Sequence, residues 1–326
     1  MTLFLNILFL IIGLGLLIKG ADFFVDGASA IAKILKIPTL IIGLTIVALG
    51  TSLPELAVSL IAAIDNSVDL SVGNVVGSNL FNTLMVLGLT AVIVPIAIEK
   101  KVLKFELPFL LVVTLLLFIF SIIGERELTW YVGLIFLALL VFYIVFLIMR
   151  TKKEPVIEEE NEKKIPVGKA IIFSIIGVAC IITGGEFVNS TAQKIASLCG
   201  MEEKLIALTV VALGTSLPEL VTSMVAAKKG ENDIALGNVI GSNTLNILFI
   251  LGLSAVIHPL PISNELVFDL IFILFITVIL IVMAILTIKK KGINRICGII
   301  MVVLYVAYLA YIICRNYGIL PPIFVF

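Results

Sequence analysis

The chain has 326 residues, of which 61% are hydrophobic and 13% are charged, and its formal net charge at pH 7 is zero. Soluble domains carry about a quarter charged residues and under half apolar residues. This composition excludes a mainly water-soluble protein and predicts a chain that lies mostly within a membrane.

Apolar stretches of about 20 residues recur along the chain, each long enough to cross the ~30 Å hydrocarbon core as a helix. We expect an all-α integral membrane protein with ten transmembrane helices. In chain order these spans lie near residues 3–20, 38–62, 70–95, 104–123, 128–149, 167–187, 204–227, 233–257, 266–288 and 296–314. The first lacks a preceding basic segment and a following cleavage site, so we interpret it as a retained span.

The distribution of Lys and Arg predicts the orientation, because basic loops stay on the cytoplasmic side. If the N-terminus is extracellular, most basic residues of the connections fall inside, and both termini of the cell-membrane protein face out. The polar connection 150–166 is then cytoplasmic and too short to hold a folded domain. Its run Glu158–Glu160 could sense calcium, but a solvated linker is the favoured interpretation.

The chain contains an internal repeat. Residues 45–56 read TIVALGTSLPEL and residues 209–220 read TVVALGTSLPEL, and the same register aligns GNVVGSN at 73–79 with GNVIGSN at 237–243. We divide the chain into a first five-helix repeat at 1–149 with its motif at 45–82, the linker 150–166, and a second repeat at 167–326 with its motif at 209–246. Five spans per half make the two repeats inverted, an architecture that recurs in secondary transporters.

The paired motifs place polar residues on one face of an apolar helix. These stripes consist of Thr45, Ala48, Ser52, Glu55 and Ser59 in the second span, and of Thr209, Ala212, Ser216, Glu219 and Ser223 in the seventh. Pro54 and Pro218 have no amide hydrogen, so the carbonyls of Gly50 and Gly214 lose their helical partners. We therefore predict in each motif a helix break that offers backbone oxygens.

Glu55 and Glu219 are the acids that lie deep in the predicted spans. An ionised carboxylate at the bilayer centre costs roughly 3 kcal/mol or more. The two motif-bearing spans contain no Lys or Arg apart from Lys204 at the first residue of the seventh, so a mobile cation is the simplest partner, and carboxylate, hydroxyl and carbonyl oxygens suit hard cations. The alternative is that both glutamates are protonated and only bond two helices together, but duplication of the whole motif favours ion binding.

The third and eighth spans add polar groups at steps of four. These are Asn74, Ser78 and Asn82, and Asn238, Ser242 and Asn246. The glycines between them, at 73, 77, 237 and 241, are expected to let helix backbones approach closely rather than to bind ions. For Asp22 and Glu186, which the repeat also pairs, we expect an interfacial structural role.

The paired GTSLPE and GN-x-x-GSN-x-x-N motifs resemble the alpha repeats of the sodium/calcium exchangers, within the calcium/cation antiporter superfamily. The resemblance covers nearly the whole chain and is closest to prokaryotic-type members without a large regulatory loop. It implies that calcium is held by Glu55, Glu219 and the carbonyls of Thr51 and Thr215. It also implies sodium sites at Ala48, Ser52, Glu55, Ser78, Ala212, Ser216, Glu219 and Ser242, with Asn82 and Asn246 lining the middle of the site.

The resemblance further implies a secondary active antiporter that exchanges calcium for sodium by alternating access, with the first and sixth helices sliding against the other eight. We expect the exchange to be electrogenic if more than two sodium ions move per calcium. The expected partners are these two ions and the lipid bilayer, without a cofactor or nucleic acid, and the monomer holds a whole site. Asn246 replaces an aspartate of potassium-dependent relatives, which argues against potassium co-transport.

Other functions are open to the same residues. A calcium/proton exchanger would use Glu55 and Glu219 as proton carriers, and the hydroxyl-rich GTS segments favour sodium over this alternative. A channel usually builds its pore by symmetry between subunits rather than within one chain. An enzyme would need a nucleophile with a base or a metal with histidines, whereas His258 is the only histidine of the chain. The four cysteines lack pair spacing and are expected to be free thiols.

Overall fold

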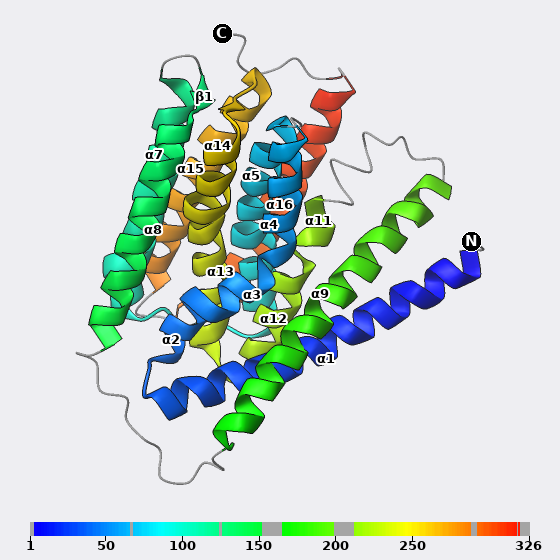
Figure 1. Cartoon of the computed structure of the whole chain (residues 1–326), viewed down its shortest axis with the longest axis vertical. Coiled ribbons are helices and arrows are strands. Elements are labelled where there is room, and N and C mark those ends of the chain that lie inside the picture. The colour runs from blue at the N-terminus through cyan, green and yellow to red at the C-terminus, as the bar shows by residue number, and fades with distance from the viewer. Residues whose placement is uncertain are drawn as a thin grey trace. The chain divides into compact units, whose positions relative to one another are not determined.

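The structure is a computed structural model, and it describes residues 3–65, 68–123, 126–151, 165–198, 212–287, 292–317 and 319. Apart from one two-stranded sheet, the regular structure in these ranges is helical (Figure 1). The α-helices are α1 (Leu3–Leu35), α2 (Thr39–Ile42), α3 (Ala48–Thr51), α4 (Leu53–Ile64), α5 (Val68–Phe81), α6 (Leu87–Ile93), α7 (Leu107–Ile122), α8 (Trp130–Thr151), α9 (Val167–Leu198), α11 (Ala212–Thr215), α12 (Leu217–Lys228), α13 (Asn232–Leu245), α14 (Gly252–Ile257), α15 (Asn264–Thr287) and α16 (Arg295–Asn316).

In the described ranges, four turns of π-helix interrupt or extend these helices. They are η1 (Gly43–Val47), η2 (Asn82–Val86), η3 (Val102–Glu106) and η5 (Asn246–Leu251). The strands β1 (Glu127–Leu128) and β2 (Leu260–Pro261) pair antiparallel, with Glu127 opposite Pro261. Single π-helical turns inside α-helices are frequent at functional sites.

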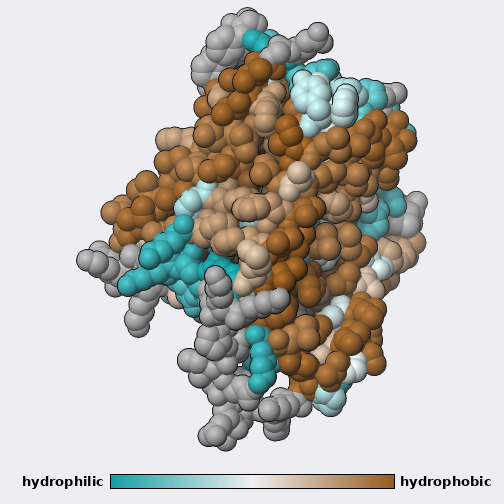
Figure 2. All heavy atoms as spheres, turned by 60° about the vertical axis from the view of Figure 1, so that its left-hand side comes forward, coloured by the Kyte–Doolittle hydropathy of each residue, from teal (hydrophilic) through white to brown (hydrophobic). Residues whose placement is uncertain are grey.

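Eight helices in the described ranges are long and apolar enough to cross a membrane, and a bent pair over Thr39–Ile64 makes a ninth candidate. The expected span 204–227 begins outside the described residues, and α11 with α12 forms its described part. Large hydrophobic side chains are exposed along the long helices, for example Phe4 at 73% and Leu286 at 69%. Figure 2 shows such residues covering much of one face. The prediction of an all-helical multi-pass membrane protein is confirmed.

The chain divides into two compact units, each taken from both sequence repeats. Unit 1 consists of Met1–Pro54 and Ile144–Gly241, and unit 2 of Glu55–Tyr143 and Ser242–Phe326. The boundaries cut through the repeated motifs, after Pro54 and after Gly241. Each unit therefore contains part of each motif.

In unit 1, α1 packs along the length of α9 (Figure 1). Glycines permit this approach: a Cβ at Gly184 would lie 2.8 Å from the carbonyl oxygen of Gly13, and one at Gly20 would lie 2.9 Å from that of Gly177. Helix α1 also contacts α2 and α12. Small residues at a helix interface favour such close packing within membranes.

Both helices of this pair extend beyond the predicted span ends. Sequence analysis placed the ends near residues 20 and 187, whereas α1 continues to Leu35 and α9 to Leu198. Asp22 was expected at the interface at the end of the first span, but its side chain and that of Asp26 bond to another part of unit 1. A polar group that finds a partner need not end a membrane helix.

In unit 2, α7 packs on α15, and α16 packs on α6. A Cβ at Gly88 would lie 3.1 Å from the carbonyl oxygen of Gly298, so the α6–α16 contact is again close. Ile96 and Ile293 exchange two backbone hydrogen bonds of 2.9 Å and join the segments that precede η3 and α16. The ring of Tyr143 on α8 stacks on Phe109 at 4.6 Å between centroids.

Candidate functional site

The first motif forms a broken helix, as predicted. Helix α3 ends at Thr51, Ser52 has φ −85° and ψ 10°, and α4 begins at Leu53. The pair spanning Thr39–Ile64 is bent by 52° at this point. Pro54 explains the break, because it has no N–H for the i−4 carbonyl and its ring clashes with that carbonyl. Glu55 then lies in the first turn of α4, where the positive end of the helix dipole favours a carboxylate.

The second motif repeats this geometry. Helix α11 ends at Thr215, Ser216 has φ −91° and ψ 5°, and α12 begins at Leu217. Glu219 lies in the first turn of α12, and the Ser216 side chain makes no capping hydrogen bond. The identical sequence therefore gives the same local backbone. The φ and ψ angles of both serines lie in the sparsely populated bridge region of the Ramachandran plot, which many active-site residues occupy.

Unit 1 contains a buried cluster around Glu219. The Oγ of Ser52 donates a hydrogen bond of 2.8 Å to Oε1 of Glu219. Glu219 is fully buried and Ser52 is 3% exposed. The hydroxyl comes from the first motif and the carboxylate from the second, so the fold brings the two motifs together here. Hydrogen bonds to an ionised group are roughly twice as strong as neutral ones.

Asn238 holds this cluster together. Its Nδ2 donates to the backbone oxygen of Glu219 at 3.3 Å and to Oγ of Ser223 at 3.0 Å. Its Oδ1 accepts a hydrogen bond of 3.0 Å from Oγ1 of Thr51. We call Thr51, Ser52, Glu219, Ser223 and Asn238 the Glu219 cluster. One buried amide therefore fixes both the backbone of the glutamate and the end of the broken helix α3.

Glycines allow α13 to approach the first motif. A Cβ at Gly237 would lie 2.7 Å from the carbonyl oxygen of Leu40, and one at Gly241 would lie 2.6 Å from that of Leu44. These contacts confirm the packing role predicted for both residues. In unit 2 the repeat-related glycines differ. Among described atoms, a Cβ at Gly73 would meet only Leu266, at 4.0 Å, and one at Gly77 would meet nothing within 4 Å.

Unit 2 contains the matching contacts of Glu55, which is also fully buried. Asn74 donates to the backbone oxygen of Glu55 at 3.3 Å and to Oγ of Ser59 at 2.9 Å. These two distances nearly equal those that Asn238 makes to Glu219 and Ser223. Each repeat therefore uses one asparagine to hold its own glutamate helix.

Asparagines form a second network in unit 2. Asn79 donates to the backbone oxygen of Asn243 at 3.1 Å, and Asn243 donates to Oγ1 of Thr83 at 2.8 Å. Asn246 donates to Oδ1 of Asn79 at 2.9 Å. No role was predicted for Asn79, Asn243 or Thr83, although each copy of the repeated GSN motif contains one of these two asparagines. The repetition of both asparagines within membrane spans was the sequence signal that could have indicated a role for them.

The two predicted site-lining asparagines occupy equivalent backbone positions. Asn82 begins the π-helical turn η2, and Asn246 begins η5. Both are fully buried. Within the described part of the chain, neither amide atom of Asn82, nor Oδ1 of Asn246, nor Oγ of Ser78 has a hydrogen-bond partner. Buried polar atoms are normally paired, so the oxygens of Asn82, Asn246 and Ser78 are suited to an ion or a water molecule, and Nδ2 of Asn82 to a water molecule.

The other predicted site residues are also buried. Thr215, Ser216 and Ser242 are at most 3% exposed. Ala48 is fully buried, and its carbonyl accepts hydrogen bonds from the Ser52 amide at 3.0 Å and from Oγ1 of Thr51 at 3.3 Å. Ala212 opens α11. No three His, Cys, Asp or Glu side chains gather as a metal site among the described residues.

In the described part of the chain, the spans contain two further buried acids, whose burial was not predicted from the sequence. Glu106 accepts a hydrogen bond of 2.9 Å from the Tyr143 hydroxyl. Asp269 forms an ion pair of 3.2 Å with Arg315. Glu106 and Asp269 both lie near the start of a predicted span, where an acidic side chain is usually exposed at the membrane interface. Because partners of fixed position satisfy them, they do not need a mobile cation.

Comparisons with known proteins agree with this geometry. The family model described as "Sodium/calcium exchanger protein" matches residues 5–149 and 169–314. The sodium/calcium exchanger MaX1 of Methanosarcina acetivorans is 34% identical over 301 residues, which cover 81% of this chain and 86% of MaX1. The inner membrane protein YrbG of Escherichia coli is 38% identical over 259 residues, which cover 77% of this chain and 79% of YrbG.

A solved structure shares the fold. The sodium-calcium exchanger NCX_Mj, soaked with 2.5 mM Na+ and 10 mM Sr2+, superimposes with a TM-score of 0.82 at 33% identity. The similarity covers 95% of this chain and 99% of that one. The chain therefore belongs to the sodium/calcium exchanger family, in its form without a large regulatory loop, and is an exchanger rather than an enzyme.

Proposed function

We propose that this protein is a secondary active antiporter that exchanges calcium for sodium, and that Glu55 and Glu219 bind both ions. The observation that carries the proposal is the buried hydrogen bond of 2.8 Å between Ser52 of one motif and Glu219 of the other. It joins a hydroxyl and a carboxylate, two ligand types that hard cations prefer, where membrane burial disfavours an unpaired charge.

The calcium ligands in this proposal are the carboxylates of Glu55 and Glu219 and the carbonyls of Thr51 and Thr215. Two carboxylates balance one divalent ion, which removes the cost of burying two charges. The two glutamates belong to different compact units, and the support for a shared site is the repeat itself. Each lies in the first helical turn after the same break and is held by an equivalent asparagine.

Sodium is proposed to use overlapping ligands. These are the hydroxyls of Ser52, Ser78, Ser216 and Ser242, the carbonyls of Ala48 and Ala212, and the two glutamates, with Asn82 and Asn246 lining the site. Ser78 supports this assignment, because its buried Oγ has no hydrogen-bond partner among the described residues. Overlap makes the ions compete, so binding of one set displaces the other.

The architecture proposed for transport is ten helices in two inverted repeats, 1–149 and 167–326, joined by the linker 150–166. Alternating access would expose the site to each side in turn, and transport of more than two sodium ions per calcium would make exchange electrogenic. We propose that the protein acts as a monomer in the cell membrane with both termini outside. The potassium-independent character rests on Asn246, an uncharged residue in the middle of the asparagine network.

Calcium uptake into proteoliposomes tests the function. An outward sodium gradient should drive uptake of labelled calcium, and Glu55→Gln or Glu219→Gln should abolish it, because an amide cannot balance the cation charge. Glu186→Gln is the matched control, since Glu186 is an exposed acid of α9. Uptake driven by an outward proton gradient alone would instead assign the protein to the calcium/proton exchangers.

A further inference from the structure

A polar stripe runs along the C-terminal half of α1. Lys19, Asp22, Asp26 and Ser29 follow steps of three and four, so they share one helix face. They lie within the candidate membrane span Phe4–Leu35. Ionisable residues in a membrane span are expensive and usually have an identifiable partner or function.

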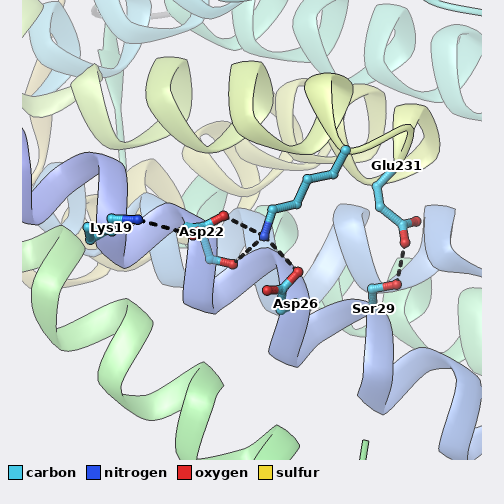
Figure 3. A network of polar contacts seen from close by, with 6 residues as sticks. Lys19, Asp22, Asp26, Ser29 and Glu231 are labelled. Carbon is cyan, nitrogen blue, oxygen red and sulfur yellow. Dashed lines mark hydrogen bonds and ion pairs between the residues drawn. The ribbon is translucent and has the colours of Figure 1, made fainter. Parts of the chain in front are cut away.

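The partner of this stripe is the turn between α12 and α13 (Figure 3). Nζ of Lys229 lies 2.6 Å from Oδ1 of Asp22 and 2.7 Å from Oδ1 of Asp26, and it donates to the Asp22 carbonyl oxygen at 2.9 Å. Ser29 donates a hydrogen bond of 2.5 Å to Oε1 of Glu231. We call these contacts the Lys229 clasp. Through it, the three-residue loop 229–231 contacts two helical turns of α1.

The turn itself has a fixed geometry. The amide of Glu231 donates to the carbonyl of Ala226 at 2.9 Å, and that of Gly230 donates to Ala227 at 3.1 Å. Gly230 has φ +83°, which completes a Schellman cap at the end of α12. Because α12 carries Glu219 and α13 carries Asn238, the clasp connects α1 to both helices of the Glu219 cluster.

The clasp joins residues of both repeats, but the symmetry-related positions do not encode a second copy of it. The register that aligns the motifs pairs Asp22 with Glu186 and Lys229 with Asp65. Two acids cannot form an ion pair with each other, so Asp65 and Glu186 cannot make the equivalent contact. A contact that breaks the internal symmetry favours one position of α1 over its symmetry-related alternative.

We propose that Lys229 is a positioning residue for ion exchange: its clasp holds α1 in one position against the α12–α13 turn and must open in each exchange cycle. This inference rests on the antiport proposed above. Among the described residues, the polar contacts of Lys229 go to Asp22 and Asp26, which are not proposed ion ligands, so it acts on the rate of exchange rather than on ion binding. The side chains of Lys229, Asp22 and Asp26 are 27%, 38% and 42% exposed, so solvent screening limits the effect.

Calcium–calcium exchange in proteoliposomes tests this role without requiring sodium. Lys229→Met should raise the maximal exchange rate roughly threefold to tenfold, because the clasp no longer has to open, and should change equilibrium calcium affinity less than about twofold. Lys228→Met is the matched control, since it removes the same charge from the adjacent exposed residue. Lys229→Arg should keep the wild-type rate, and Asp22→Asn should reproduce part of the increase.

The outcomes separate the clasp from the proposed function. If Lys229→Met and Asp22→Asn exchange calcium no faster than Lys228→Met, or if either loses equilibrium calcium binding, the positioning role is wrong. If the wild type exchanges calcium for calcium but sodium does not drive uptake, the sodium coupling is wrong while the clasp remains tested. Should Lys229→Met fail to fold, Asp22→Asn alone decides the question.

Discussion

The Ser52–Glu219 contact predicts how one hydroxyl affects the two ions differently. Ser52→Ala removes the donor of the buried hydrogen bond of 2.8 Å and, in the proposed site, one sodium ligand. A hydrogen bond to a charged group contributes about 1.5–3 kcal/mol. Because about 1.4 kcal/mol is a tenfold change in an equilibrium constant, sodium binding should weaken roughly tenfold to hundredfold.

Calcium should respond much less, because its proposed ligands do not include the Ser52 side chain. We expect Ser52→Ala to change equilibrium calcium affinity less than about threefold. The assay measures the sodium concentration that half-maximally drives uptake of labelled calcium, together with calcium binding to the purified protein. The two measurements separate a lost sodium ligand from general damage.

Ser121→Ala is the matched control for this prediction. Ser121 is a fully buried serine of α7, and the change removes the same hydroxyl from the membrane interior. It should leave the response to both ions unchanged. If Ser52→Ala behaves like Ser121→Ala, or weakens sodium and calcium equally, the assignment of Ser52 to the sodium site is wrong.

Two further predictions concern unit 1. Gly241→Ala should lower the stability by about 1–3 kcal/mol, because its Cβ would lie 2.6 Å from the Leu44 carbonyl oxygen. Gly15→Ala is the control and should not lower it, because a Cβ there would meet no described atom within 4 Å. Equal melting temperatures of the two variants would contradict the packing role of Gly241. Burial lowers the pKa of Lys229, but the hydrogen bonds that its ammonium donates to Asp22 and Asp26 outweigh this, so the pKa lies above its ordinary value of 10.5. The stability that the Lys229 clasp contributes is therefore fully present below pH 10.5 and lost as the pH rises through the raised pKa. Melting temperatures of wild type and Lys229→Met should differ below pH 10.5 and converge above it, and a constant difference would show that the ion pair does not titrate.

The local geometry of the motifs could be predicted from the sequence. Proline at 54 and 218 removes the amide that a continuous helix needs, and both helices break at the preceding serine. Burial of Glu55 and Glu219 followed from their place in apolar spans whose interiors contain no basic residue. These inferences succeed because they depend on covalent structure and on the cost of burying charge.

Contacts between the two motifs could not be predicted in the same way. The repeat indicates that Asn74 and Asn238 are equivalent, but not that each donates to the backbone of its own glutamate helix. Which residues meet across the repeats, such as Ser52 with Glu219, depends on the packing of α13 against the first motif. Side-chain patterns within one helix do not contain that information.

The ends of α1 and α9 show a different limit. A hydropathy pattern places Asp22 and Asp26 at the membrane interface. It contains no information on their partner Lys229, which lies 207 and 203 residues further along the chain. The same limit applies to Asp269, whose partner Arg315 belongs to another helix. Polar residues in membrane spans are therefore best interpreted together with their partners.

The central claim is that Glu55 and Glu219 together form one calcium site for which sodium competes. Equilibrium binding of calcium to the purified protein, measured by calorimetry with and without sodium, tests it most directly. We predict that the wild type binds calcium and that sodium displaces it. Glu55→Gln and Glu219→Gln should each abolish calcium binding, whereas Glu186→Gln should not. Calcium binding of wild-type affinity in either glutamate variant, or binding insensitive to sodium, would contradict the claim.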